Sequence, residues 1–142
     1  MPFTIDTTTP FGERAERRLH DERLAWLTTT SADGTPQPVP VWFLWDGADS
    51  FLIYSKPGTA KLRNIEERPR VSLHLDGNGQ GGDIVVLSGV ASLVPDAPGA
   101  DAVPQYLEKY APHMARLGYD PAGFAAKYSQ AIRITLTRLR GH

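Results

Sequence analysis

Six β-rich segments, mostly joined by turns of hairpin length, constrain the fold of this chain more than any other feature. They span residues 24–30, 35–47, 50–56, 70–76, 83–94 and 131–139. These segments are rich in β-branched and aromatic residues, and several are joined by turns of hairpin length, such as SADG at 31–34. Strands joined by short turns pair in antiparallel fashion. The pattern therefore predicts a mainly β fold, an antiparallel barrel with added α-helices.

One of these segments carries a signal for self-association. Residues 70–76 alternate between apolar and polar side chains, as expected for a strand with one buried face. Residues 83–94 are apolar on both faces, and one small barrel cannot bury both. We therefore expect this strand to contribute to a dimer. Within it, Gly89 predicts a β-bulge or a close approach of another backbone.

Helical patterns flank and interrupt the strands. A charged helix is expected at 11–22, and residues 98–129 are expected to form a helical insert before the last strand. Within the insert, Asp120-Pro121 is typical of an N-cap followed by the first helical residue. Residues 1–10 are polar and are interpreted as a loose arm, and 1–142 as a single domain. The apolar face of the first insert helix comprises Val103, Tyr106, Leu107, Tyr110 and Met114.

The composition argues against several classes of protein. A formal net charge of −1 over 142 residues does not favour a nucleic-acid-binding surface. The chain has no cysteine, which excludes disulfides and fits a reducing compartment, so we expect a cytoplasmic protein. The N-terminal sequence lacks the apolar core of a signal peptide. No apolar run reaches the roughly 20 residues that cross a bilayer, so no membrane span is expected.

Two sequence patterns resemble functional motifs but lack the required context. The sequence GNGQGG at 77–82 has the spacing of a dinucleotide fingerprint, which requires a helix directly after it. A strand-like sequence follows instead, so the glycines are expected to form a hairpin connection. The four histidines do not pair at metal-ligand spacing, and no metal site is expected.

The second β-rich segment has an unusual distribution of prolines. Pro36, Pro38 and Pro40 occupy alternate positions, so one side of this strand cannot donate backbone hydrogen bonds. Val41 and the aromatic residues Trp42, Phe43 and Trp45 follow. Two interpretations remain open. The segment is either a protected edge strand followed by core aromatics, or an open flank on which a flat ligand lies.

Three cations gather at the start of a short helix that begins near Thr59. Lys56, Lys61 and Arg63 lie where the partial positive charge of the helix N-terminus makes cations unfavourable. A bound phosphate or polyanionic tail would resolve this conflict, with Thr59 and Asn64 as further donors. The alternative is a solvated basic face that the two following glutamates partly neutralise.

The order of these motifs resembles the pyridoxamine 5′-phosphate oxidase-like superfamily, and most closely its branch that binds the deazaflavin coenzyme F420. The most specific stretches are DGTPQPVPVWF at 33–43 and AKLRNIEERPRVSL at 60–73. The resemblance implies a six-stranded antiparallel split β-barrel of the FMN-binding type. It also implies a homodimer with cofactor sites at the subunit interface and a small-molecule substrate.

The resemblance also implies a set of cofactor-binding residues. Lys61 matches the lysine that meets the cofactor phosphate, and Val41 and Trp42 match the strand beside the ring system. FMN-binding members carry an arginine and a lysine along the strand equivalent to 38–46, whereas this chain has no cation there. Coenzyme F420 is therefore expected rather than FMN. The full set is Val41, Trp42, Ser55, Lys56, Thr59, Lys61, Arg63 and Asn64.

The leading interpretation is thus an F420-dependent oxidoreductase that transfers a hydride between the deazaflavin and a small electron-poor organic substrate. Two alternatives stay open: an FMN-binding enzyme like pyridoxamine phosphate oxidase, and a non-catalytic dimer that carries a flavin-like or haem-like ligand. The sequence does not single out a catalytic residue. The hydride chemistry would belong to the cofactor, while the protein positions it.

Overall fold

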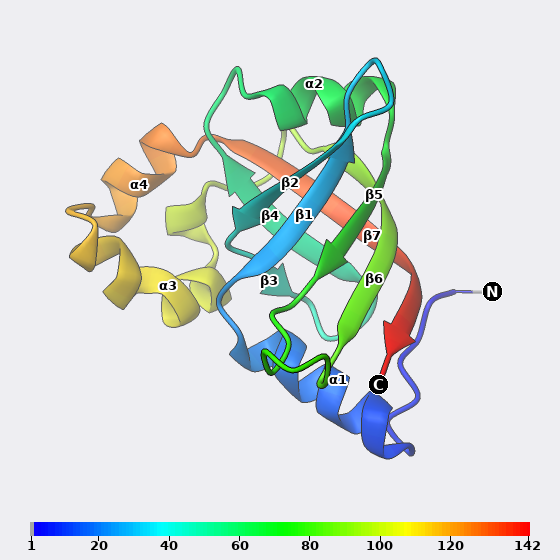
Figure 1. Ribbon diagram of the computed structural model, residues 1–142. Coiled ribbons are helices and arrows are strands. Elements are labelled where there is room, and N and C mark those ends of the chain that lie inside the picture. Colours follow the sequence, from blue (N-terminus) through cyan, green and yellow to red (C-terminus); the bar gives the residue numbers. More distant parts are fainter. Residues whose placement is uncertain (1) are drawn as a thin grey trace.

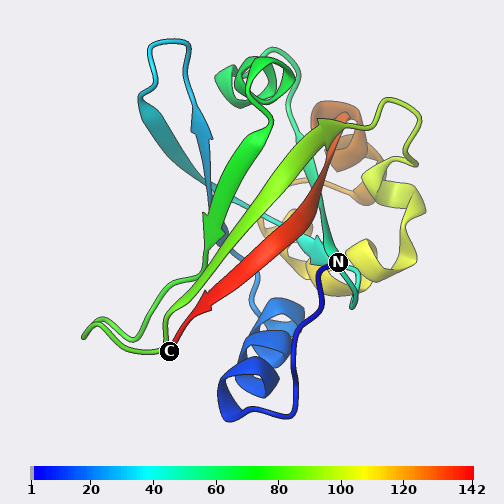
Figure 2. The ribbon, with the colours of Figure 1, turned by 90° about the vertical axis from the view of Figure 1, so that its right-hand side faces the viewer.

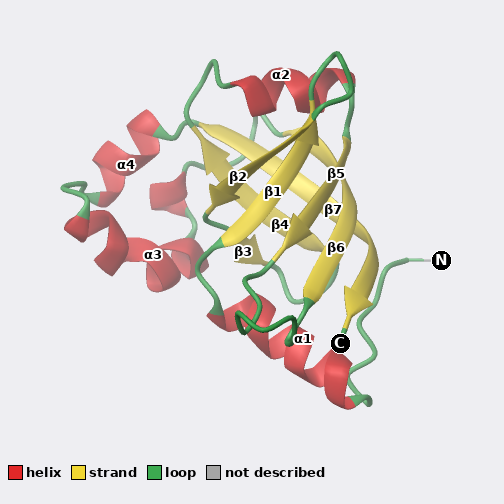
Figure 3. Cartoon of the chain, in the orientation of Figure 1, coloured by secondary structure: helices red, strands yellow, loops and turns green. Residues whose placement is uncertain are grey.

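Seven strands form one antiparallel sheet, in the order β2-β1-β5-β6-β7-β4-β3. The computed structural model describes residues 2–142. Figure 3 shows the sheet surrounded by helices on three sides. In chain order the elements are α1 (Pro10–Asp21), β1 (Ala25–Thr30), β2 (Pro36–Val41), β3 (Leu44–Trp45), β4 (Ser50–Ser55), α2 (Ala60–Glu67), β5 (Arg70–His74), β6 (Val85–Leu93), the 3₁₀ turn η1 (Ala100–Ala102), α3 (Pro104–Arg116), α4 (Pro121–Lys127) and β7 (Gln130–Gly141).

The sheet must curl, because its two edge strands are almost adjacent in the sequence. Only Trp42 and Phe43 separate β2 at one edge from β3 at the other. In a flat sheet, six spacings of about 4.8 Å would place these edges roughly 29 Å apart. The three Cα–Cα steps from Val41 to Leu44 span at most about 11 Å. The chain therefore rolls the sheet into a half-barrel, as the curved strands in Figures 1 and 2 show.

The predicted split barrel is confirmed, but the predicted number of six strands is wrong. Residues 35–47 were expected to form one strand, whereas the structure breaks this segment at Trp42 and Phe43. The two halves pair with different partners: β2 pairs with β1, and β3 pairs with β4. A single straight strand cannot pair at both edges of a curled sheet, so the chain changes direction between them.

The prolines of β2 lie at the edge of the sheet, as predicted. This strand pairs only with β1, where Pro36, Pro38 and Pro40 oppose Thr30, Thr28 and Trp26. The unpaired side of β2 therefore belongs to residues that have no N–H to offer, which protects the edge against further pairing.

The bulge predicted at Gly89 is present in β6. The register between β6 and β7 shifts between Ser88 and Gly89. A Cβ atom added at Gly89 would lie 2.8 Å from Ile134 Cγ2 and 2.8 Å from the Thr135 carbonyl oxygen. Only glycine fits at this close approach, which bends the longest strand pair of the sheet. The connection from β5 to β6 contains the GNGQGG sequence and joins two antiparallel strands, so the expected hairpin is confirmed.

Helices close the barrel at both ends and along one side. In Figure 1, α1 lies below the barrel, α2 above it, and α3 and α4 beside it. The insert between β6 and β7 thus supplies η1, α3 and α4. Helix α1 is attached through Arg18, which donates to the carbonyl oxygen of Asp83 at 2.7 Å, and through Arg14, whose Nε lies 2.9 Å from Asp83 Oδ1. Residues 2–9 contain no helix or strand, and Phe3 packs against the core.

Two hydrophobic clusters stabilise the fold. The barrel core lies inside the curled sheet and includes Leu27, Phe43, Phe51, Leu73 and Leu87, all fully buried. The second cluster, called here the insert cluster, lies between the sheet and the insert. It contains the apolar face predicted for the first insert helix, and its buried members are Tyr54, Ala100, Tyr106, Tyr110, Met114, Phe124 and Ala131.

Candidate functional site

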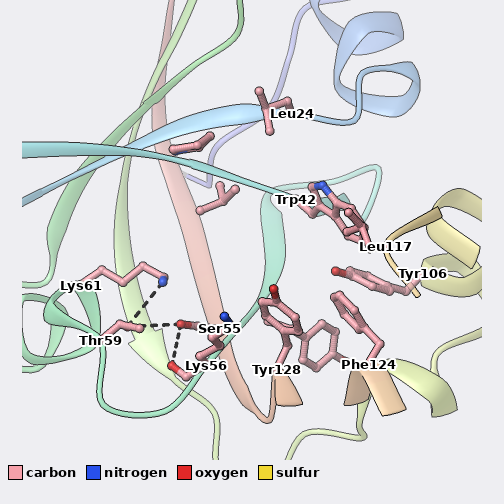
Figure 4. A pocket seen from close by; sticks show the side chains of 13 residues that line it. Leu24, Trp42, Ser55, Lys56, Thr59, Lys61, Tyr106, Leu117, Phe124 and Tyr128 are labelled. Atoms are coloured by element: carbon pink, nitrogen blue, oxygen red, sulfur yellow. Dashed lines mark hydrogen bonds between the residues drawn. The ribbon is translucent and has the colours of Figure 1, made fainter. Parts of the chain in front are cut away.

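A pocket of about 420 Å³ opens where the broken strand, the end of β4, the start of α2 and the insert meet. Its size is within the range of small-molecule sites. Figure 4 shows two distinct sides. Lys56, Lys61 and the hydroxyl side chains of Ser55 and Thr59 form one side, and aromatic side chains from the insert form the other.

Lys61 dominates the polar side of the pocket. Its ammonium group is half-buried and lies 3.4 Å from Thr59 Oγ1. Burial, together with repulsion from Lys56, lowers the pKa of Lys61 below its ordinary value. Both effects disfavour the charged form in the folded protein. An anion bound between the two lysines would offset both effects, because it would pair with both cations and favour the charged form of Lys61.

The N-terminus of α2 has no internal compensation for its positive end. Thr59 is the N-cap residue, but its side chain does not accept a hydrogen bond from the helix, and the first turn contains no acidic residue. In contrast, Thr9 caps α1 through the N–H of Gly12, and Asp120 caps α4 through the N–H of Gly123. Thr59 Oγ1 instead lies 3.3 Å from Ser55 Oγ. Free N–H groups and two lysines together make this corner suitable for a phosphate.

The opposite side of the pocket is built from stacked rings. Trp42 stacks on Phe124 with ring centroids 5.4 Å apart and an interplanar angle of 13°, and Phe124 stacks on Tyr128 at 4.4 Å and 18°. Trp42 also stacks on Tyr110 at 4.6 Å and 3°. Packing of this kind holds the rings in fixed orientations and gives the pocket a rigid apolar wall.

The insert also fixes the break in the β2–β3 segment. The hydroxyl of Tyr110 accepts from the N–H of Phe43 at 2.9 Å and lies within bonding distance of its carbonyl oxygen, also at 2.9 Å. Lys109 donates to the same carbonyl oxygen at 2.8 Å. Backbone groups that leave the sheet at the break thus find partners on α3. The neighbouring Trp42, which lines the pocket, is held in place as a result.

The structure brings six of the eight predicted residues together and leaves two outside. Arg63 lies on an exposed position of α2. Asn64 is buried, and its amide donates to Thr29 Oγ1 and Gln37 Oε1, both at 3.0 Å, so it connects α2 to the β1–β2 hairpin. The six residues that line the pocket are Val41, Trp42, Ser55, Lys56, Thr59 and Lys61.

Sequence reasoning missed the contribution of the insert to the pocket. The apolar face of its first helix was identified from spacing, but it was assigned only to packing. The available signal was the density of aromatic residues between 106 and 128. The additional lining residues are Leu24, Pro40, Tyr54, Tyr106, Leu117, Phe124 and Tyr128.

Comparison with known proteins identifies the family. The family model described as pyridoxamine 5′-phosphate oxidase matches residues 11–142, which is nearly the whole chain. The chain belongs to the pyridoxamine 5′-phosphate oxidase family. This confirms the superfamily inferred from the sequence motifs. Members of this family are often oxidoreductases. A search of curated protein sequences gave no significant match.

Solved structures with the same fold differ in what their names say they bind. An F420 reductase is 24% identical with a TM-score of 0.65, covering 88% of this chain and 94% of its own. A FAD-binding protein from Mesorhizobium loti is 24% identical with a TM-score of 0.62, covering 87% and 85%. A conserved hypothetical protein from Mycobacterium tuberculosis is 23% identical with a TM-score of 0.68, covering 99% and 88%. At these identities the likeness establishes the shared fold alone.

Two further properties of the described residues bear on the site. Across residues 2–142, no three His, Asp or Glu side chains gather in a way that would hold a metal ion. None of the helices described has the length and apolar character needed to cross a membrane.

Proposed function

We propose that this protein is an oxidoreductase that uses coenzyme F420 and transfers a hydride between the deazaflavin and a small electron-poor organic substrate. The observation that carries the proposal is the separation of charge within one pocket. Both cations of the pocket lie beside the uncompensated N-terminus of α2, and its other side is aromatic. Such a pocket suits a ligand with a flat ring system at one end and an anionic tail at the other.

The residues present fit a deazaflavin better than a short flavin phosphate. Residues 36–45, which form β2, β3 and the break between them, contain no lysine or arginine. A ribityl phosphate close to the ring would therefore lack a cation on this strand. Lys61 lies on the side of the pocket away from the aromatic wall, and Lys56 lies between them, with its Nζ 5.5 Å from the centroid of the Tyr128 ring. The phosphodiester and glutamate tail of the longer cofactor would extend towards these two lysines.

The proposed division of work follows from these positions. When bound in its reduced form, the deazaflavin supplies a hydride from its central ring. Lys61 and Lys56 hold the anionic part, with the hydroxyl of Thr59 as a further donor. Val41 and Trp42 orient the ring system along the broken strand. The aromatic wall excludes water from the space where the substrate meets the ring.

Titration of the purified protein with F420 and with FMN tests the cofactor assignment. Both can be followed by fluorescence, and we expect tighter binding of F420. Tighter binding of FMN would instead favour the flavin enzyme of the same fold, for which the FAD-binding structural relative is the supporting observation. Turnover of menadione, a small quinone, with reduced F420 then separates an enzyme from a carrier, since a carrier would bind the cofactor without consuming the quinone.

We further propose that the protein acts as a homodimer. The outward face of β6 remains open in the single chain, with Val90 42% exposed and Ser92 also exposed. This face borders a hollow of about 650 Å³ along β1, β5 and β6. Light scattering should show a dimer at micromolar concentration, and Val90→Arg should shift it towards monomer. A stable wild-type monomer would contradict this arrangement.

A further inference from the structure

Three tyrosines of the insert cluster pack against one another, but only two of their hydroxyl groups have partners. The rings of Tyr54 and Tyr110 lie 5.0 Å and 4.9 Å from that of Tyr106. The hydroxyl of Tyr54 donates to the carbonyl oxygen of Pro98 at 2.8 Å, and that of Tyr110 bonds to the backbone of Phe43. The Tyr106 hydroxyl is buried and has no hydrogen-bond partner among the described residues.

An unpaired buried hydroxyl destabilises the folded protein, because it loses its bonds to water and gains nothing in return. Such groups are rare in folded proteins and call for a specific explanation. Tyr106 has 0% exposure and lines the pocket, and Figure 4 shows its hydroxyl directed away from α3 and towards the pocket interior. Its position therefore suggests that the missing partner is a bound molecule.

We propose that Tyr106 is a substrate-recognition residue, whose hydroxyl donates a hydrogen bond to a carbonyl or nitro oxygen of a planar, uncharged aromatic acceptor. The inference rests on the proposed function and names the class of substrate. It adds a buried hydrogen-bond donor to a wall that consists mainly of ring surfaces.

The chemistry of the surrounding wall selects this class. The pocket lining contains no acidic residue that would neutralise a cation. Of its two lysines, Lys61 lies on the other side, and Lys56 Nζ lies 5.5 Å from the centroid of the Tyr128 ring. Because the proposed function assigns both lysines to the anionic part of the cofactor, an uncharged ligand fits the aromatic side. Stacked rings favour a flat ligand. Burial, followed by the neighbouring tyrosines, raises the pKa of Tyr106 far above its ordinary value, so the hydroxyl keeps its proton and remains a donor. A ligand oxygen that accepts a hydrogen bond from this hydroxyl would supply its missing partner.

Entry of the ligand requires a small side-chain movement, because solvent does not reach the hydroxyl in the ligand-free pocket. Tyr128 follows the last turn of α4, is half-buried and lines the same pocket. The ring of Phe124 lies 6.2 Å from that of Tyr106 and 4.4 Å from that of Tyr128. We expect movement of these two outer rings to open a path to the hydroxyl.

Direct binding of two matched probes to the full-length protein tests the proposal. Menadione is a flat naphthoquinone, and 2-methylnaphthalene has the same ring system without the carbonyl oxygens. Binding is followed through the fluorescence of Trp42, which lines the pocket. Menadione cannot form thiol adducts here, since the chain contains no cysteine. We expect Tyr106→Phe to weaken menadione binding roughly three- to tenfold and to leave 2-methylnaphthalene unchanged.

Tyr119→Phe is the matched control. It also removes one tyrosine hydroxyl from a ring that packs against the insert cluster, but Tyr119 does not line the pocket. It should leave both probes bound as before. Tyr106→Phe should keep or raise the melting temperature, because it removes an unpaired polar atom.

Three results would overturn the proposal. Equal affinity of wild type and Tyr106→Phe for menadione would mean that the hydroxyl does not contact the ligand. Equal losses for both probes would mean that Tyr106 acts only through packing. Failure of menadione to bind the wild-type protein would exclude this substrate class. Because the probes are measured without a cofactor, these results are independent of whether the protein binds F420.

Discussion

Replacing Lys61 by methionine tests the anion site at the start of α2. Methionine keeps most of the aliphatic stem that packs in the half-buried position and removes only the charge. A charge-assisted hydrogen bond contributes about 1.5–3 kcal/mol, so the dissociation constant for F420 should rise roughly ten- to a hundredfold. Burial and repulsion from Lys56 both lower the pKa of Lys61, which means that its charge destabilises the ligand-free fold. The free energy of unfolding of the ligand-free variant should therefore be unchanged or higher.

The same helix provides a matched control in Arg63→Met. Arg63 carries the same charge two residues further on, but it is exposed and lies outside the pocket. Fluorescence titration with F420 and urea unfolding should be run on both variants at one salt concentration. Equal losses of affinity would show that the lysine acts through diffuse electrostatics. A Lys61→Met protein that is clearly less stable would show that the residue has a structural role, and the reasoning above would be wrong.

Three other perturbations have defined outcomes. Gly89→Ala should lower the free energy of unfolding in urea by about 1–3 kcal/mol, because the new Cβ would lie 2.8 Å from Ile134 Cγ2. Asn64→Ala should cost about 1–3 kcal/mol by leaving Thr29 without its buried partner, while calorimetry of the folded variant should find F420 affinity little changed. Burial lowers the pKa of Lys109 from 10.5 to about 8. Between these two pH values the unfolded chain therefore binds more protons than the folded protein. Stability in urea should therefore rise from pH 8 towards about pH 10, and Lys109→Met should lack this rise.

Local patterns in the sequence were sufficient to predict most of the elements. The six β-rich segments became strands because alternation and turn residues act over a few neighbouring positions. The edge position of β2 followed from Pro36, Pro38 and Pro40, since a missing N–H has the same consequence in any fold. The bulge at Gly89 and the N-cap at Asp120 were predictable for the same reason.

The count of strands was not predictable in this way. Nothing local to Trp42 and Phe43 marks a break, because both residues favour extended structure. The break exists because β2 and β3 pair at opposite edges of a curled sheet, and because Tyr110 supplies partners to Phe43 across 67 positions of sequence. Pairings over such separations depend on the whole topology.

The candidate site divides along the same line. The sequence by itself determined that Lys56, Thr59 and Lys61 lie close together. A strand ends, a turn follows and a helix begins within a few residues of one another. Only the tertiary structure decided that the insert forms the aromatic wall and that the Tyr106 hydroxyl has no partner. Helix periodicity shows which face of α3 is buried. It does not show what that face is buried against, because the partners come from elements on both sides of α3 in the sequence, from Tyr54 in β4 to Phe124 in α4 and Ala131 in β7.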